Sequence, residues 1–530
     1  MSIRSETGGT VTELVTSLDE LPEGWRIERL GAIAELNPRH PKNVIDRTSV
    51  TFLPMPALSE SSPDFDRTLI RSLGEVRKGY THFRDGDVLF AKITPCMENG
   101  KGAVATALQN GIGCGTTELH VLRPTRLVDP YYLYRFLQQS SIRELAAANF
   151  TGSAGQLRVP ASFLTELELP LPPLDEQRRI VSKLEALLAQ VTTAQQRLSR
   201  IPALLKRFRQ SVLAAACSGR LTADWREEQT SIEAAEQLIG KVLVERFELW
   251  CKVANAKAKA DGRVLSGDTW KQRYTQPITI ESSQQFKIPD SWKWCAFDTF
   301  AASFQYGPRF GEDEYIQSGV PTVRTSDMNF RGEISLDNPP CVTIPPNSHD
   351  HFLLKQDDLV VTRTGATIGK CALYDAEIGP AIASAYLIRY RLTRTTTLPR
   401  YLITVLMSPW GQQHLIGGAT AVAQPNVNTT TIASIPIPLP PLAEQQEIVR
   451  RVKQLFALAD RIESRLQAAR ERVDRLTQAL LAKAFRGELV PTEAELARQE
   501  GREYESAEEL LARFSAVPEA ATEKKGRRKG

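Results

Sequence analysis

Two pairs of loops rich in glycine and polar residues contain the side chains best suited to chemistry. The first pair is Ile93-Thr-Pro-Cys-Met-Glu-Asn-Gly-Lys101 and Arg363-Thr-Gly-Ala-Thr-Ile-Gly-Lys370; the second is Thr151-Gly-Ser-Ala-Gly-Gln-Leu-Arg158 and Thr420-Ala-Val-Ala-Gln-Pro-Asn-Val-Asn428. Lysine, arginine and hydroxyl side chains bind phosphate oxygens, while Gln or Asn pairs with adenine and Arg or Lys with guanine. The loops therefore predict contacts to nucleic acid. The alternative is a set of structural turns with incidental polar residues.

Motifs typical of catalysis are weak or missing. Asn338-Pro-Pro-Cys341 is similar to the Asn-Pro-Pro-aromatic motif of amino-methyltransferases, in which the aromatic ring stacks on a flipped base, but its fourth residue is cysteine. The glycine cluster Gly111-Ile-Gly-Cys-Gly115 lacks the following helix that a nucleotide site needs. There is no GxxxxGK[ST] or HExxH pattern, and the sequence His349-Asp-His351 fits a surface loop. We expect no catalytic site and no metal site in this chain.

Composition sets broad limits on function. The chain has 530 residues, so two or more domains are expected. A net charge of +4 permits nucleic-acid binding without requiring it. Its seven cysteines never form a CxxC pair, which disfavours structural zinc and a disulfide framework. No apolar run of about 18 residues and no signal-peptide core are present, so we expect a cytoplasmic protein without membrane contact.

Short β-branched and aromatic runs, divided by glycine, proline and aspartate, indicate the strands that position these loops. Each half of the chain has three such runs followed by a segment with helical spacing. The predicted strands are 50–56, 86–92 and 118–123 in the first half and 320–327, 357–363 and 385–391 in the second, and the predicted helices are 130–145 and 398–410.

The two halves are an internal duplication. Leu171-Pro-Pro-Leu-Asp-Glu-Gln-Arg-Arg-Ile-Val181 returns as Leu439-Pro-Pro-Leu-Ala-Glu-Gln-Gln-Glu-Ile-Val449, an offset of 268 (439 − 171). Upstream, Leu21-Pro-Glu-Gly-Trp25 returns as Ile288-Pro-Asp-Ser-Trp292. Matching flanks at a nearly constant offset show that the duplicated unit includes both the strands and the helical segments after them.

A long helix is predicted after each Pro-Pro pair. Apolar residues recur alternately every three and four positions from Ile180 and from Ile448, which is the pattern of a coiled-coil seam. Gly219 and Gly487 are plausible C-terminal caps. We expect the two helices to pack on each other antiparallel, with a kink or break at Pro202. The alternative is two unrelated partner-binding coiled coils.

Segments outside the duplicated core carry weaker signals. Residues 222 to 281 are charged and helix-prone, and Ala235-Glu-Gln-Leu-Ile239 weakly matches Ala507-Glu-Glu-Leu-Leu511. We expect short helices packed on the ends of the long ones. The residues after Phe514 are expected to be disordered.

In combination, the duplicated Leu-Pro-Pro-Leu-x-Glu-Gln helix, the stretch Lys92 to Lys101 and the stretch Gly152 to Val159 resemble the specificity subunit of type I restriction-modification systems. The resemblance covers roughly residues 21 to 490. Pro202 and the charged insert depart from the family pattern. The resemblance implies an α+β fold: two similar mixed α/β target recognition domains, separated by a pair of long antiparallel coiled-coil helices in a pseudo-twofold repeat.

The corresponding domain boundaries match the duplication. They are a polar leader (1–20), target recognition domain 1 (21–170), spacer helix 1 (171–222), a charged helical insert or linker (223–285), target recognition domain 2 (286–438), spacer helix 2 (439–490), and a short helix with a disordered basic tail (491–530).

The resemblance also implies a division of labour. The chain would be non-catalytic and would read a bipartite DNA target, one half per recognition domain. Double-stranded DNA, two modification (methyltransferase) subunits and restriction (motor-nuclease) subunits are the expected partners. No cofactor is expected in this chain, while S-adenosylmethionine, ATP and Mg are expected in the partner subunits. The alternatives are a non-DNA coiled-coil scaffold joining two β-rich modules and, disfavoured by the missing cofactor loop, a self-sufficient methyltransferase.

The candidate DNA-binding residues come from the four loops and one strand end. Those hypothesised to contact phosphates carry positive charge, and those hypothesised to contact bases carry amides. The phosphate candidates are Lys92, Lys101, Arg158, Arg363 and Lys370; the base candidates are Gln156, Gln424, Asn426 and Asn428; Thr94, Ser153, Arg324 and Thr364 complete the predicted surface.

Overall fold

The computed structural model divides into two compact units. Unit 1 comprises Met1–Ser199 and Gln467–Gly530, and unit 2 comprises Arg200–Leu466. The structure describes residues 21–60, 62–153, 156–229, 235–281, 285–344, 349–365, 367–394, 397–417 and 427–515. The predicted leader and the tail from residue 516 onward lie outside the described residues.

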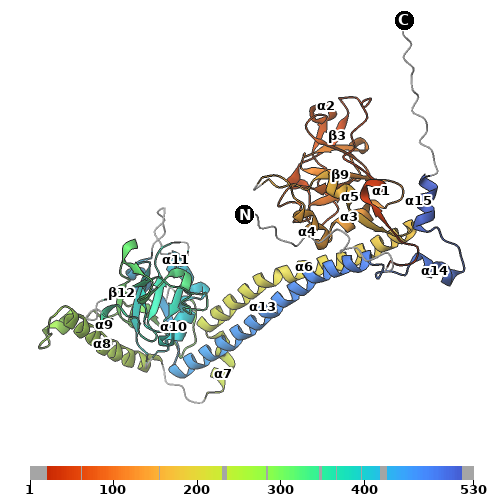
Figure 1. Ribbon diagram of the computed structural model, residues 1–530. Helices are drawn as coiled ribbons and strands as arrows, with labels where there is room; N and C mark the ends of the chain where they lie inside the picture. The colour runs from red at the N-terminus through yellow and green to blue at the C-terminus, as the bar shows by residue number, and fades with distance from the viewer. Residues whose placement is uncertain are drawn as a thin grey trace, which may run out of the picture. The chain divides into compact units, whose positions relative to one another are not determined.

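Unit 1 is built on two four-stranded sheets and a two-stranded ribbon, with orders β2-β9-β6-β7, β4-β3-β8-β5 and β1-β10 (Figure 1). β3 and β8 run parallel, and the other pairs are antiparallel. The strands are β1 (Arg26–Arg29), β2 (Ala34–Leu36), β3 (Ser49–Leu53), β4 (Ile70–Ser72), β5 (Thr81–Arg84), β6 (Val88–Ala91), β7 (Gly102–Val104), β8 (Ile112–Gly115), β9 (Leu119–Pro124) and β10 (Glu168–Leu171).

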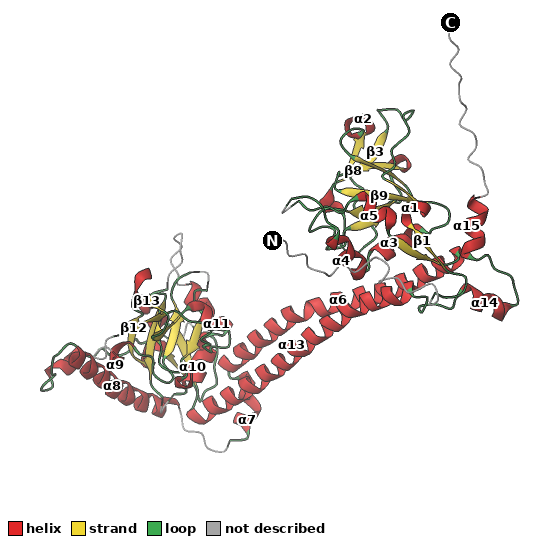
Figure 2. Ribbon diagram, in the orientation of Figure 1, coloured by secondary structure: helices red, strands yellow, loops and turns green. Residues whose placement is uncertain are grey.

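Unit 2 repeats this plan. Its sheets have the orders β12-β19-β16-β17, β13-β15-β14-β18 and β11-β20, and β14 and β18 form its parallel pair (Figure 2). The strands are β11 (Lys293–Ala296), β12 (Ala301–Tyr306), β13 (Tyr315–Ile316), β14 (Val320–Val323), β15 (Cys341–Val342), β16 (Leu359–Thr362), β17 (Cys371–Leu373), β18 (Ile382–Ala383), β19 (Leu387–Leu392) and β20 (Pro436–Leu439). The shared sheet plan confirms the predicted internal repeat.

The six predicted strands coincide with β3, β6 and β9 in unit 1 and with β14, β16 and β19 in unit 2. The two shorter predicted helices are each divided. Residues 130–145 form α3 (Pro130–Leu137) and the start of α4 (Ser140–Ala148), and residues 398–410 form α10 (Pro399–Leu406) and the start of α11 (Pro409–Gly417). The prediction missed these turns because apolar spacing continues across them.

The two long helices are α6 (Leu174–Cys217) and α13 (Leu442–Phe485), each 44 residues long. They pack antiparallel in both units. In unit 1 the Gln195 amide bonds to Asp474 at 3.1 Å, and in unit 2 the Arg209 guanidinium bonds to Asp460 at 2.8 Å. Residues later in α6 therefore contact residues earlier in α13, as antiparallel packing requires. Of the kink or break predicted at Pro202, the break is wrong, because α6 continues through this residue.

Each unit folds its sheets onto its share of the helix pair. In unit 1, Ile180 and Leu184 of α6 and Leu481 of α13 join the same core cluster as Tyr132 of α3. In unit 2 the corresponding core is lined by residues from both long helices and from α10, among them Val212, Ile448, Val452 and Tyr401. The seam residues are thus shared between the helix pair and the sheets.

A buried Trp–Glu hydrogen bond ties the start of each long helix to its unit. Trp25 donates its indole N–H to Glu176 at 2.8 Å, and Trp292 donates to Glu444 at 2.8 Å. Both carboxylates are fully buried, and burial raises the pKa of Glu176. The recurring Glu of the Pro-Pro-Leu-x-Glu-Gln motif is therefore a structural acceptor.

The neighbouring glutamine completes this attachment. Gln177 accepts from the Asp129 backbone N–H at 2.8 Å and donates to the Leu127 carbonyl at 3.0 Å. Gln445 likewise accepts from the Leu398 N–H at 2.9 Å. Each Gln thus fixes the chain that leads into α3 or α10 against the first turn of a long helix.

The charged insert is placed differently from the prediction. α8 (Ala235–Ala260) packs along β12 and the short helix α9 (His349–Phe352), although Leu238 and Val242 at its start do reach the end of α6. The weak match with Ala507 marks equivalent contacts: the Ala235 N–H bonds to the Ser291 carbonyl at 3.3 Å, and the Ala507 N–H bonds to that of Gly24 at 3.1 Å.

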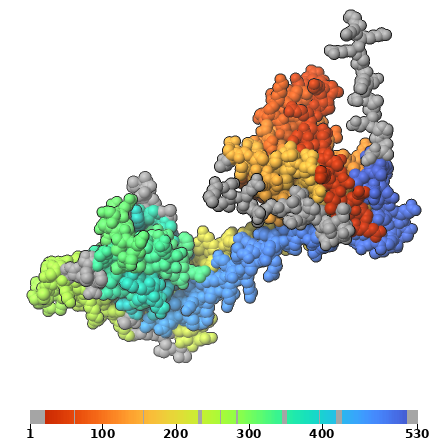
Figure 3. All heavy atoms as spheres, viewed as in Figure 1, coloured from red at the N-terminus to blue at the C-terminus, as the bar shows by residue number. Residues whose placement is uncertain are grey.

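The C-terminal helices α14 (Glu493–Glu500) and α15 (Ala507–Ser515) belong to unit 1 and lie against its N-terminal segment (Figure 3). The Glu493 N–H at the start of α14 donates to Glu176 at 2.8 Å. In unit 2 the same task falls to Thr222, whose hydroxyl donates to Glu444 at 2.7 Å. None of the helices in the described part of the chain is both long and apolar enough to cross a membrane.

Replacing Trp292 with Phe tests the buried Trp–Glu bond. Trp292→Phe leaves a buried carboxylate one hydrogen bond short, so the free energy of unfolding should fall by about 1.5–3 kcal/mol. Trp410→Phe is the matched control, because Trp410 donates to a neutral carbonyl, that of Pro436, at 3.0 Å and should lose about 0.5–1.5 kcal/mol. Urea denaturation of the full chain measures both, and equal losses would contradict the special role of the Glu444 bond.

Gly487→Ala tests the close approach at the end of α13. Gly487 has φ +76° and a Cβ there would collide with Pro22, whereas Gly501 has φ +63° with open space around it. Gly501→Ala should therefore lower the free energy of unfolding only by the cost of a left-handed backbone, about 1–2 kcal/mol. Gly487→Ala should lower it clearly more. Thermal unfolding compares the two, and similar losses would show that contact with Pro22 is unimportant.

Candidate nucleic-acid interface

The two polar loops predicted in the first half lie side by side in unit 1. Ile93 and Arg158 form an isolated antiparallel bridge. The Thr94 N–H donates to the Leu157 carbonyl at 3.1 Å, and the Val159 N–H donates to the Lys92 carbonyl at 2.9 Å. The fold therefore brings the 92–101 and 151–158 loops into one surface, which their separation in the sequence did not reveal.

Arg158 is committed to an ion pair inside this surface. Its guanidinium forms a two-pronged contact with Glu118, at 2.7 Å and 2.9 Å. This contact lowers the pKa of the Glu118 carboxyl. A third N–H of Arg158 donates to the Gln156 carbonyl at 2.9 Å. Arg158 thus braces the loop that presents Gln156.

The 92–101 loop is held at its far end by an amide. Gln138 donates to the Gly100 carbonyl at 2.8 Å, and a Cβ at Gly100 would collide with the side chains of Gln138 and Arg143. Thr94 donates its hydroxyl to Glu98. Among the predicted residues of unit 1, four have no side-chain hydrogen bond or ion pair to another described residue: Lys92, Lys101, Ser153 and Gln156.

Unit 2 reproduces the same backbone arrangement with other side chains. The Val427 N–H donates to the Arg363 carbonyl at 2.8 Å, as Val159 does to Lys92, and the Arg363 N–H donates to the Tyr386 carbonyl at 3.0 Å, as Lys92 does to Glu118 at 3.0 Å. Arg363 is therefore the structural counterpart of Lys92, and Tyr386 the counterpart of Glu118.

Lys370 and Arg324 are engaged within unit 2. The Lys370 ammonium donates to the carbonyls of Thr325 and Met328, at 3.1 Å and 2.7 Å, and the residue is only 9% exposed. Arg324 contacts Asp327 at 2.8 Å, and this carboxylate raises the pKa of Arg324. Both cations hold the turn that comes after β14.

Two aromatic residues beside Arg363 were missed as site residues. The Arg363 guanidinium lies 4.9 Å from the centre of the Tyr306 ring, and Tyr386 is 61% exposed. Exposed aromatic faces beside arginine are typical of surfaces on which bases stack. Tyr386 falls within a predicted strand. The one signal that could have marked it as a site residue was the position of this strand next to the loop that begins at Arg363.

The remaining predicted site residues of unit 2 differ in their structural surroundings. Thr364 comes directly after Arg363 and is half-buried. Asn428 caps α12 (Thr429–Ala433), accepting from the Thr431 N–H at 2.7 Å. Gln424 and Asn426 lie outside the described residues. Within the described ranges, no group of three or more His, Cys, Asp or Glu residues is arranged to hold a metal ion.

Comparisons with known proteins agree with this geometry. The family model described as "Type I restriction modification DNA specificity domain" matches residues 22–203 and 304–471. The chain is 29% identical to the type I restriction enzyme EcoEI specificity subunit of Escherichia coli, covering 87% of this chain and 82% of that one. It is 30% identical to the EcoKI specificity subunit of Escherichia coli strain K12, covering 89% and 91%.

Solved structures share the fold. A chain from a structure of the complex assembly and conformational transition of the type I R-M system aligns with TM-score 0.63 and 19% identity, over 88% of this chain and 99% of that one. The HsdS subunit from Thermoanaerobacter tengcongensis aligns with TM-score 0.54 and 19% identity, over 88% and 98%. The family match spans both duplicated halves, and the chain belongs to the family of type I restriction-modification DNA specificity subunits.

Proposed function

We propose that this chain reads a bipartite DNA sequence for a type I restriction-modification complex, with one half of the target contacted by each unit. The observation that carries the proposal is the shared backbone register of the two loop pairs, Val159 to Lys92 and Val427 to Arg363, with different side chains in each. A common frame with different polar side chains suits two readers of two different sequences.

We sort the candidate residues into four proposed roles. Lys92, Lys101 and Arg363 are proposed to contact phosphates, and Gln156 with the unit 2 amides Gln424, Asn426 and Asn428 to contact bases. Thr94, Ser153 and Thr364 are proposed to contribute hydrogen bonds at the edge of the surface. Arg158, Arg324 and Lys370 already have protein partners, so their proposed contribution is to hold the loops and add positive charge.

The antiparallel helices are proposed to set the distance between the two half-sites. Each has 44 residues, and an α-helix advances about 1.5 Å per residue. A helical pair of fixed length would impose a fixed gap of unread base pairs, as subunit geometry does in dimeric DNA-binding proteins.

Catalysis is proposed to lie in partner subunits. The relatives are named specificity subunits, and the roles proposed for the loop residues of this chain are contacts to phosphates and bases. We propose that two modification subunits, which use S-adenosylmethionine, and restriction subunits, which use ATP and Mg, assemble on this chain in the cytoplasm. An electrophoretic shift with duplex DNA, with and without a modification subunit, distinguishes this role from a protein scaffold, which would produce no shift in either case.

Alanine at Lys92 tests the assignment of phosphate contacts. Lys92→Ala should weaken binding to all duplexes alike and reduce the slope of log affinity against log salt by about one. Lys183→Ala, on an exposed position of α6, is the matched control and should leave both unchanged. Gln156→Ala should instead change the preferred bases of one half-site, by about 1–3 kcal/mol per base pair. A change of preferred sequence caused by Lys92→Ala would contradict the assignment.

Insertion of four residues into both long helices tests the spacing role. Additions after Ser199 and after Ala469 would lengthen each helix by about 6 Å, so the unread gap should grow by about one to two base pairs while both half-sites stay the same. Methylation mapping of the assembled complex reads this directly. Altered half-sites with an unchanged gap would show that the helices do not set the distance.

A further inference from the structure

Glu118 in unit 1 is a carboxylate that lies between the two polar loops and belongs to neither. It comes directly before β9, and its backbone carbonyl accepts from the Lys92 N–H at 3.0 Å. Both of its side-chain oxygens accept from the Arg158 guanidinium, at 2.7 Å and 2.9 Å. One acidic residue is therefore in contact with both of the loops that are proposed to bind DNA.

The Glu118 carboxylate is negatively charged at neutral pH and open to solvent. The hydrogen bonds from Arg158, followed by the charges of Arg158 and Lys92, lower the pKa of Glu118 despite its partial burial. The side chains of Arg158 and Glu118 are 35% and 25% exposed. A DNA phosphate that approaches either cation therefore also approaches a negative charge.

This negative charge lowers the attraction of unit 1 for DNA in general. Affinity for DNA of any sequence comes from cations that neutralise phosphates and release counterions. Arg158 and Glu118 together carry no net charge, so the pair adds little to that attraction, and the carboxylate itself repels phosphates. The cost applies to every duplex, whether or not its bases fit the loops.

The same ion pair holds the loop that presents Gln156. Arg158 donates a further N–H to the Gln156 carbonyl at 2.9 Å, and the backbones of Arg158 and Thr151 exchange two hydrogen bonds, each at 2.9 Å. Two parallel N–H···O bonds to a carboxylate fix the plane of a guanidinium. Glu118 thus positions Arg158, and through it the backbone on which the Gln156 amide is carried.

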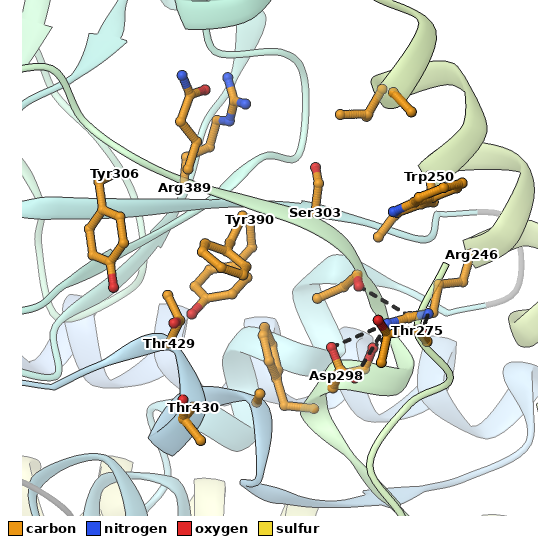
Figure 4. Close-up of a pocket in the computed structure, with 18 of the residues that line it drawn as sticks. Arg246, Trp250, Thr275, Asp298, Ser303, Tyr306, Arg389, Tyr390, Thr429 and Thr430 are labelled. Atoms are coloured by element: carbon orange, nitrogen blue, oxygen red, sulfur yellow. Dashed lines mark hydrogen bonds and ion pairs between the residues drawn. The ribbon is translucent and has the colours of Figure 1, made fainter. Parts of the chain in front are cut away.

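Unit 2 has no carboxylate at this position, because Tyr386 is the counterpart of Glu118. The Arg363 guanidinium lies 4.9 Å from the centre of the Tyr306 ring. Figure 4 shows Tyr306 and Tyr390 extending from one side of their sheet and Arg389 from the other, as alternation along β12 and β19 requires. The described side chains beside Arg363 are thus uncharged rings, and the acidic residue distinguishes unit 1 from unit 2.

We infer that Glu118 sharpens the sequence selectivity of unit 1: its charge lowers the affinity for DNA of any sequence, while its bonds to Arg158 hold Gln156 in place to read the correct one. The inference rests on the proposed function, since it requires unit 1 to bind DNA. Selectivity is a ratio of two affinities, and a residue that lowers the affinity for wrong sequences raises this ratio. Glu118 acts through Arg158 and through repulsion, so it is a positioning residue and not a base contact.

Glu118→Gln tests the inference, because it removes the charge and keeps the shape of the side chain. Fluorescence anisotropy over a salt series measures binding of the full-length chain to the target duplex, found by methylation mapping, and to a duplex without either half-site. The released Arg158 adds one cation, so the slope of log affinity against log salt should steepen by about one. Affinity for the duplex without half-sites should rise about fivefold to tenfold at about 0.1 M salt. Preference for the half-site that Gln156→Ala alters should fall, and preference for the other should not.

Glu488→Gln is the matched control. Glu488 accepts a similar two-pronged contact from Arg486, at 2.7 Å and 3.0 Å, and it follows α13, outside the four loops. Its replacement should leave both affinities and the salt dependence unchanged. Glu118→Asp separates charge from position, because it keeps the charge on a side chain one methylene shorter. Its affinity for the duplex without half-sites should stay at the wild-type level while the half-site preference falls.

Three results would overturn the inference. The first is an unchanged affinity of Glu118→Gln for the duplex without half-sites. The second is a new preferred base at one position, which would make Glu118 a base contact. The third is weaker binding to every duplex together with a lower unfolding temperature, which would show that the ion pair only maintains the fold. The proposed function fails on a different result, equal binding of target and other duplexes by the wild-type chain, which would leave no preference for Glu118 to sharpen.

Discussion

The structure depends on a carboxylate buried at the start of each long helix. Glu176 and Glu444 are fully removed from water, and such a group is costly unless its oxygens are all bonded. One oxygen accepts from the tryptophan that opens the unit. The other receives its donors from the segment that comes after the antiparallel partner helix. Sheet, helix start and helix end are thereby held at one point in each unit.

This arrangement explains why the duplicated motifs lie so far apart in the sequence. Leu-Pro-x-x-Trp, Pro-Pro-Leu-x-Glu-Gln and the glycine after each helix are pieces of one junction. Gly219 approaches Pro289, and Gly487 approaches Pro22, so the end of each helix meets the opening segment of a domain encoded elsewhere. The junction leaves the polar loops free to differ, because the residues that form these junction bonds in the described parts of the chain lie outside those loops.

The sequence predicted the repeat, the long helices and the six strands because these depend on periodic apolar residues and on repeated sequence motifs. It could not reveal contacts between residues that are distant in the sequence. Lys370 was expected at a surface, yet two carbonyls across the fold draw its ammonium inward. Arg158 was proposed as a phosphate contact, and the fold adds an ion pair with Glu118 that the sequence did not reveal. Pro202 was expected to kink or break α6, which continues through it. The place of Tyr386 beside Arg363 depends on which strands lie together, and no local sequence pattern shows this.

If each unit reads DNA independently through a frame that the helices hold, the two recognition domains should be interchangeable. The β1–β10 and β11–β20 ribbons have the same register, with Arg26 opposite Leu171 and Lys293 opposite Leu439, so they offer matched joining points. Residues 26–171 can therefore replace residues 293–439, and methylation mapping of the assembled complex can identify the new target. Independent reading predicts two copies of one half-site separated by the original gap. An unchanged target, or two different half-sites, would contradict it.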